Sequence, residues 1–139
     1  MIAQAPIVAR LLAAGFNHAE GVLEFAGLSE APRVSPALFV VPERESAGAN
    51  TLGAGAVDQK ITEIFNVVVV VRTERRPGAV NEALGEAIGA VETALAGWMH
   101  PDASSHCQIA GGRLLSTDGQ RVAWAMSFSV SRHFRKVSQ

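Results

Sequence analysis

The 139-residue sequence contains one cysteine, no tyrosine and few aromatic residues of any kind, which together make up 6% of the chain. The single cysteine, Cys107, cannot form a disulfide within the chain, which excludes a disulfide-stapled domain and fits a reducing compartment. Neither charge is in excess, because 12 Lys and Arg residues stand against 13 Asp and Glu, for a net charge of −1. A protein dedicated to binding duplex nucleic acid is usually strongly basic, so this balance argues against that class.

Long uncharged apolar stretches are also missing. None approaches the roughly 18 residues that a membrane span needs. Residues 1–16 are apolar, but they have no basic start and Arg10 interrupts them, which indicates an ordinary helix rather than a signal peptide. We therefore expect a soluble, cytoplasmic protein with no membrane partner. A hydrophobic content of 48% in this length predicts one domain over residues 1–139.

The first third of the chain predicts a helix followed by two short strands. Apolar residues at helical spacing end at Gly15, which suits a helix stop. Residues 22–25, which are apolar apart from Glu24, and the apolar residues 37–41 each predict a short strand, and Pro42 ends the second. Residues 43–56 are polar, rich in glycine and without periodicity, which predicts a long flexible or interface loop.

Residues 57–72 predict one strand of about 16 residues, where strands usually have about 5–6. One end should therefore project beyond the body of the protein. From Val67 to Val71 both faces of this strand are apolar, so both require cover. We expect the following helix to cover one face and a neighbouring subunit to cover part of the other.

The second half predicts a helix and a hairpin. Apolar residues recur every three to four positions over residues 80–98, and Asp118-Gly119 is a strong hairpin signal. The final strand, residues 122–134, has one large apolar face and one face of small residues. The expected class is α+β, with a mainly antiparallel sheet of about four to five strands and two helices packed on one face.

No catalytic motif is present, and we expect no cofactor or metal. The nearest candidate is a loop that holds the residue types of a zinc site or a thiol nucleophile. Its members are His100, Asp102, Ser104, Ser105, His106 and Cys107. Their spacing matches no defined pattern, which favours a solvated loop with Cys107 as a small core residue.

Three charged clusters allow more than one interpretation. Glu43, Arg44 and Glu45 are either an acid/base pair or a charged cluster that faces solvent or a partner. The run Glu74-Arg75-Arg76 is either a binding site for phosphates or carboxylates, or a solvated turn. The basic residues from Arg132 to Lys136 either contact a polyanion or form a frayed tail.

The order of motifs along almost the whole chain resembles the tail terminator proteins of long-tailed bacteriophages and prophages. The motifs are Pro42-Glu43-Arg44-Glu45-Ser46 with Asn50, Gln59-Lys60-Ile61-Thr62-Glu63 before a valine-rich strand ending in Arg72, Gly97-Trp98 with Pro101, Gly111-Gly112-Arg113-Leu114-Leu115, and Trp124 with Phe128. This resemblance implies a structural, non-enzymatic virion protein. Such a protein forms a ring, typically of six subunits, on the head-proximal end of the tail tube.

The resemblance also implies partners: the chain itself, the tail tube protein and a head-tail connector protein, with DNA passing through the lumen without specific binding. It implies assembly in the host cytoplasm and a final place in the virion tail. Residues 73–78 depart from the shorter turn that is usual in the family. The candidate interface residues are Glu43, Arg44, Glu45, Ser46, Asn50, Gln59, Thr62, Glu63, Arg72, Arg75 and Arg76. Two alternatives stay open, namely a head-completion or connector protein of the same virion and a small enzyme that uses His106 and Cys107.

Overall fold

The computed structural model describes residues 1–27, 34–73 and 76–137. Eight elements occur in these residues. They are α1 (Ala5–Ala13), β1 (Ala19–Glu20), α2 (Val22–Ala26), β2 (Ala37–Ala47), β3 (Val57–Arg72), α3 (Ala79–Leu95), β4 (Gln108–Thr117) and β5 (Arg121–Lys136). None of the helices among them is both long and apolar enough to cross a membrane.

The strands form a single sheet in the order β1-β2-β3-β5-β4. The short β1 pairs with β2 in parallel, and every other pair is antiparallel. The α+β class and the mainly antiparallel sheet are therefore confirmed. All 16 residues of β3 pair with β5, which makes these two strands the central ribbon of the molecule.

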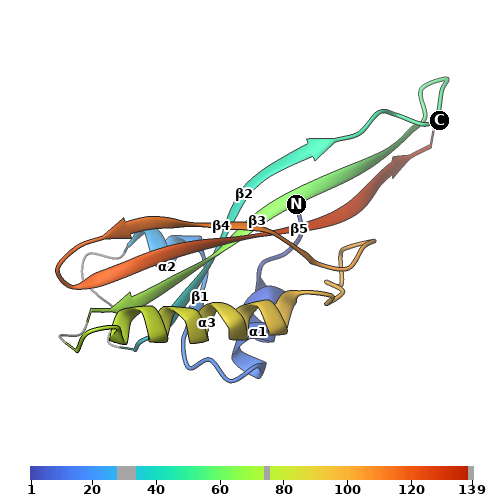
Figure 1. Ribbon diagram of the computed structural model, residues 1–139. Helices are drawn as coiled ribbons and strands as arrows, with labels where there is room; N and C mark the ends of the chain where they lie inside the picture. Colours follow the sequence, from blue (N-terminus) through green and yellow to red (C-terminus); the bar gives the residue numbers. More distant parts are fainter. Residues whose placement is uncertain (28–33, 74–75, 138–139) are drawn as a thin grey trace.

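One face of the sheet carries α1 and α3, as expected for two helices on one face (Figure 1). Val67, Val69 and Val71 point to this face and pack with Ile7 of α1 and Val91 of α3. Each of these five side chains is fully buried. Burying a valine stabilises the fold by about 1.5–3 kcal/mol, so β3 forms the centre of the main core.

The opposite face has a smaller core of its own. Val68 and Val70 pack there with Phe39 and with Phe25 of α2, and each valine is only 2% exposed. The expectation that a neighbouring subunit covers this side of the valines is wrong, because the chain itself buries them. The last strand was predicted to have one large apolar face and one face of small residues. This prediction is confirmed, since Met126 lies in the main core while Ala123 lies in the smaller one.

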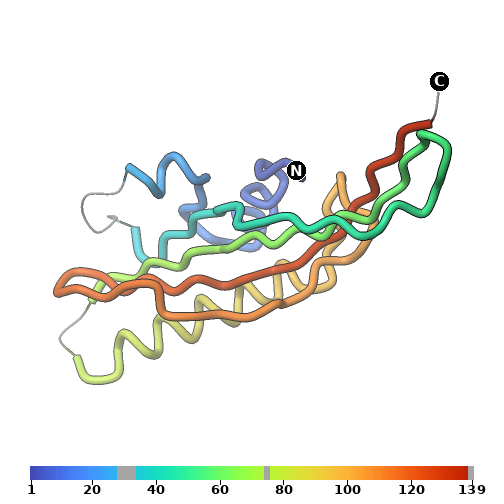
Figure 2. The backbone as a smooth tube through the Cα atoms, turned by 90° about the horizontal axis from the view of Figure 1, so that it is seen from above, coloured from blue at the N-terminus to red at the C-terminus, as the bar shows by residue number. Residues whose placement is uncertain are grey.

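A three-stranded arm extends beyond the helices. It consists of the end of β2, the beginning of β3 and the end of β5, and its tip holds both the β2–β3 loop and the end of β5 (Figures 1 and 2). The side chains of residues 43–55 are exposed along this extension. The prediction that one end of the long strand projects is confirmed.

Three predictions of local structure are wrong. Residues 22–25 belong to the short helix α2, and β1 lies before them at Ala19–Glu20. β2 does not end at Pro42 but continues to Ala47, so residues 43–47 are strand rather than loop. The basic C-terminal residues are not a frayed tail, because β5 pairs with β3 as far as Lys136.

Candidate assembly surface on the arm

A β-bulge sets the pattern of side chains at the base of the arm. The register of β2 against β3 shifts between Pro42 and Arg44. Proline cannot donate a hydrogen bond to a neighbouring strand, and a bulge leaves one residue unpaired and reverses the alternation that follows it. As a result Glu45 lies opposite Glu63, on the face of the sheet that carries α1 and α3.

Glu45 and Glu63 form an ion cluster with Arg132 of β5. The Nε of Arg132 donates to Glu63 Oε2 at 3.1 Å, and its Nη2 donates to Glu45 Oε1 at 3.3 Å. Glu63 is 3% exposed, whereas the Glu45 side chain is 39% exposed. One cation thus joins a buried and an open carboxylate across three strands.

The environment of Glu45 lowers its pKa from 4.5 to about 2. The largest cause is its hydrogen bond with the Glu63 carboxyl group, followed by the N-terminal amino group and by Arg132. The amino group of Met1 lies 3.2 Å from Glu45 Oε1. Glu45 is therefore ionised at neutral pH.

The same cluster holds the segment before α1 against the sheet. The backbone N–H of Ile2 donates to both oxygens of Glu63, at 2.9 and 3.0 Å. Ala3 is held from the other side, because its N–H donates to Asp102 at 3.1 Å and its carbonyl contacts the His100 Nε2 at 2.6 Å. Since the Asp102 N–H donates to His100 Nδ1, the proton of this imidazole lies on Nε2.

Asn50 organises the loop at the tip of the arm. Its Oδ1 accepts from the N–H groups of Leu52 and Asp58, and its Nδ2 donates to the Ala56 carbonyl at 2.9 Å. Gln59 adds a bond from its Nε2 to the Gly48 carbonyl at 3.0 Å. Asn50 and Gln59, which were predicted as interface residues, therefore hold the conformation of the loop through hydrogen bonds.

The arm tip combines apolar exposure with positive charge. Phe134 is 46% exposed and Val137 is 65% exposed. The Asp58 Oδ1 lies 3.2 Å from the His133 Nδ1, so this carboxylate has a polar partner within the arm. Among the residues that the structure describes, no carboxylate lies within ion-pair distance of the three remaining cations, Lys60, Arg135 and Lys136.

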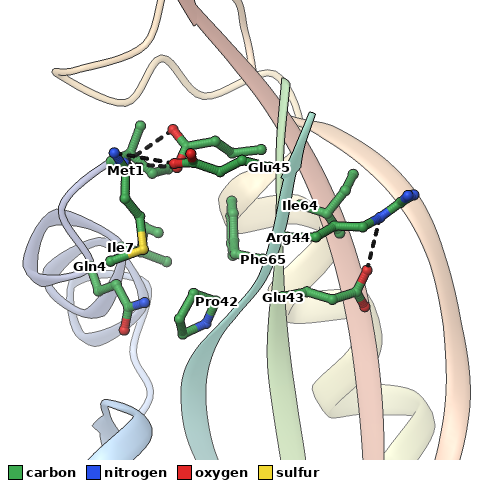
Figure 3. A pocket seen from close by; sticks show the side chains of 11 residues that line it. Met1, Gln4, Ile7, Pro42, Glu43, Arg44, Glu45, Ile64 and Phe65 are labelled. Atoms are coloured by element: carbon green, nitrogen blue, oxygen red, sulfur yellow. Dashed lines mark hydrogen bonds and ion pairs between the residues drawn. The ribbon is translucent and has the colours of Figure 1, made fainter. Parts of the chain in front are cut away.

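A pocket of about 180 Å³ opens between the bulge of β2 and the segment before α1 (Figure 3). Its apolar part is formed by Ile2, Ile7, Pro42 and Phe65, and the side chains of three glutamates and one arginine also line it. Figure 3 shows Glu43 turned toward Arg44, which lies 3.4 Å away, and Glu45 turned toward Met1. Glu43 also accepts a hydrogen bond from Asn66 Nδ2 at 3.1 Å, and Arg132 pairs with Glu45 and Glu63. The pocket therefore has an apolar interior and a rim of paired charges.

The remaining predicted interface residues fall into two groups. Ser46 lies opposite Thr62 in the arm, which places both beside the charged cluster. Arg72 and Arg76 are at the other end of β3, where Arg76 forms a 2.9 Å ion pair with Glu82 at the start of α3. Arg75 lies outside the described residues. The structure thus brings the 43–50 and 59–63 segments together and separates them from the arginines.

The loop that offered a thiol or zinc site holds structural contacts instead. His100 is fully buried rather than solvated, and Ser104 and Ser105 bond the backbone of Ser131. Cys107 lies in the main core, where burial raises the pKa of its thiol to about 12. Within residues 1–27, 34–73 and 76–137, no three His, Cys, Asp or Glu residues are grouped to hold a metal ion.

Sequence reasoning missed Arg132 and Phe134 as parts of this surface. The signal was available, because Val130, Arg132 and Phe134 continue the alternation of the last strand. The basic composition of the C-terminus pointed instead to a solvated tail.

Comparison with known families matches the sequence over residues 1–139 to the model of the phage tail terminator protein family. A search of curated proteins found no match. Because the family model covers the whole described fold, including the arm, the chain belongs to the phage tail terminator family.

Proposed function

We propose that this chain forms a ring that caps the head-proximal end of the phage tail tube, stops its polymerisation and supplies the surface to which the head is joined. Membership of the tail terminator family supports a structural role in the tail. The partners in this proposal are further copies of the chain, the tail tube protein and a head-tail connector protein. Assembly in the host cytoplasm would precede incorporation into the virion.

The projecting arm is the observation that carries the proposal. It places two open strand edges and an exposed aromatic side chain outside the body of the subunit. Open edges favour pairing with another chain, and repeated head-to-tail contacts close into a ring when the rotation between copies permits it. A closed ring can cover the end of a growing tube without itself polymerising.

The charge of the chain is compatible with a lumen through which DNA passes. The net charge is −1, and the exposed cations of the arm tip are few. A strongly basic lumen would retain DNA by electrostatic attraction to its phosphates. The proposal therefore assigns no specific DNA contact, no cofactor and no catalytic residue to the ring.

Removing residues 47–55 tests the role of the arm. Since Ser46 pairs with Thr62, residues 56–61 would form the new turn between β2 and β3, while residues 62–72 keep β5 as their partner. We therefore expect the shortened chain to fold, with a circular dichroism spectrum close to that of the wild type. In a phage that carries this deletion, electron microscopy should show tails of uncontrolled length or tails that are not joined to heads.

Normal tail lengths together with normal infectivity in a folded deletion variant would overturn the proposal. The same images also distinguish the proposed terminator from its main alternative. A head-completion or connector protein of the same virion would give tails of normal length that lack heads, whereas loss of a terminator also affects the length of the tails.

A further inference from the structure

We infer that the pocket at the base of the arm receives Phe134 from the arm of a second copy of this chain. The arm tip of each copy would then dock at the arm base of the next. This inference rests on the proposed function, because it names the surfaces through which the ring closes.

The pocket is the right size and polarity for one aromatic ring. Its volume is about 180 Å³, and its interior is formed by Ile2, Ile7, Pro42 and Phe65. An apolar cavity of about 150 Å³ in a protein binds benzene, so this pocket has room for a phenyl group.

Phe134 is the side chain of the arm that best fits this pocket. It is 46% exposed although it belongs to a paired strand. It lies opposite Gln59, four residues before Glu63 on β3, which is about 13 Å along the strand from the pocket. Phe134 therefore cannot fill the pocket of its own chain, while the pocket of a second copy is open to it.

The charges at the two surfaces do not decide the pairing. Glu45 and Glu63 carry charges that are balanced by the Met1 amino group and by Arg132. Glu43 is paired with Arg44 and accepts a hydrogen bond from Asn66. The apolar contact of the Phe134 ring with the interior of the pocket therefore supplies the attraction.

The two surfaces lie on opposite edges of the arm. In the described residues β1 pairs with β2 only at Leu38 and Phe39, and β4 pairs with β5 only as far as Ser129. Beyond these points β2 and β5 are the two outer strands, with β3 between them. Phe134 and Glu45 also lie on the same face of the sheet. The β5 edge of one copy can therefore lie beside the β2 edge of the next copy, with Phe134 over the pocket, in a heterologous contact.

Two variants test the contact from its two sides. Phe134→Ser removes the inserted ring, and Gln4→Trp fills the pocket, where Gln4 is a lining residue whose side chain makes no helix-cap bond. We expect each variant alone to remain a monomer of 14.6 kDa in sedimentation velocity, with self-association weakened about tenfold or more. Mixed in equal amounts, they should form a heterodimer and nothing larger, because only one intact contact is available per pair.

Leu114→Ser is the matched control, since Leu114 is an equally exposed apolar residue at 52% on β4, away from the arm. It should assemble like the wild type. If Phe134→Ser or Gln4→Trp also assembles like the wild type, the inference is overturned while the ring remains. If the wild-type chain stays monomeric even with tail tubes present, the proposed function fails instead.

Discussion

Arg132 donates a hydrogen bond of 3.1 Å to Glu63, whose side chain is almost completely buried where the arm leaves the body. This bond joins β5 to β3, and through the Ile2 N–H it also joins the sheet to the segment before α1. Glu63 was expected to face a neighbouring subunit, but its burial assigns it to the stability of the arm. The surfaces available to partners lie beside it.

Arg132→Met should destabilise the fold by about 3 kcal/mol, because removing one partner of a buried ion pair leaves an uncompensated charge. Urea unfolding measures this as a lower transition midpoint. Arg135→Met, which removes an exposed cation from the same strand, should change the midpoint little. Equal midpoints for the two variants would contradict the structural role of the Arg132–Glu63 pair.

The stabilisation by Glu45 should depend on pH. Its pKa falls from 4.5 to about 2 in the folded chain, so the unfolded state binds a proton more readily. The stabilising effect is therefore complete above about pH 4.5 and is lost as pH falls toward 2. The difference in unfolding free energy between the wild type and Glu45→Gln should shrink over this range. A difference that stays constant from pH 5 to pH 2 would contradict the stabilising role of the Glu45 carboxylate.

Gly112→Ala should destabilise the β4–β5 pair. A Cβ at this position would lie 2.9 Å from the Trp124 Nε1, so the indole ring would have to move. Overpacking of this kind costs about 1–3 kcal/mol. Gly119→Ala in the same hairpin meets nothing within 4 Å and serves as the control. A similar unfolding midpoint for both variants would show that Trp124 does not lie over Gly112.

Cys107 should be unreactive in the folded protein. Burial raises its pKa to about 12, so little thiolate exists at pH 8. A thiol reagent should modify it only after the addition of denaturant, and Cys107→Ala should leave tail assembly intact. Rapid modification of the native protein, or loss of infectivity in a folded Cys107→Ala variant, would favour the enzyme hypothesis that the loop first suggested.

The sequence predicted the fold class because its long elements have strong periodicity. The 16-residue strand, the helix α3 and the final hairpin all follow from alternating or helical spacing. Residues 22–25 were misassigned because a short segment with three apolar residues and one glutamate fits a strand as well as one turn of helix. Pro42 indicated a strand end, since nothing in the local sequence distinguishes an end from a bulge at a sheet edge.

The assembly surface was harder to predict than the fold. The segments around Glu45 and Glu63 were both predicted to face a partner. The structure pairs them across β2 and β3 and buries Glu63, a difference that only the register reveals. The pocket unites residues from before α1 with residues of β2 and β3. No local pattern in the sequence connects segments so far apart.

A variant that carries both Gln4→Cys and Lys136→Cys, and so keeps the Phe134 ring, tests the head-to-tail ring most directly. The native Cys107 is buried and should not interfere. After oxidation of assembled caps, a non-reducing denaturing gel should show a ladder of linked copies that ends at one fixed number, and neither single-cysteine variant should give a ladder. Absence of linked copies from the double variant, or dimers formed equally by the single variants, would contradict a ring built by docking the arm tip of one copy into the arm base of the next.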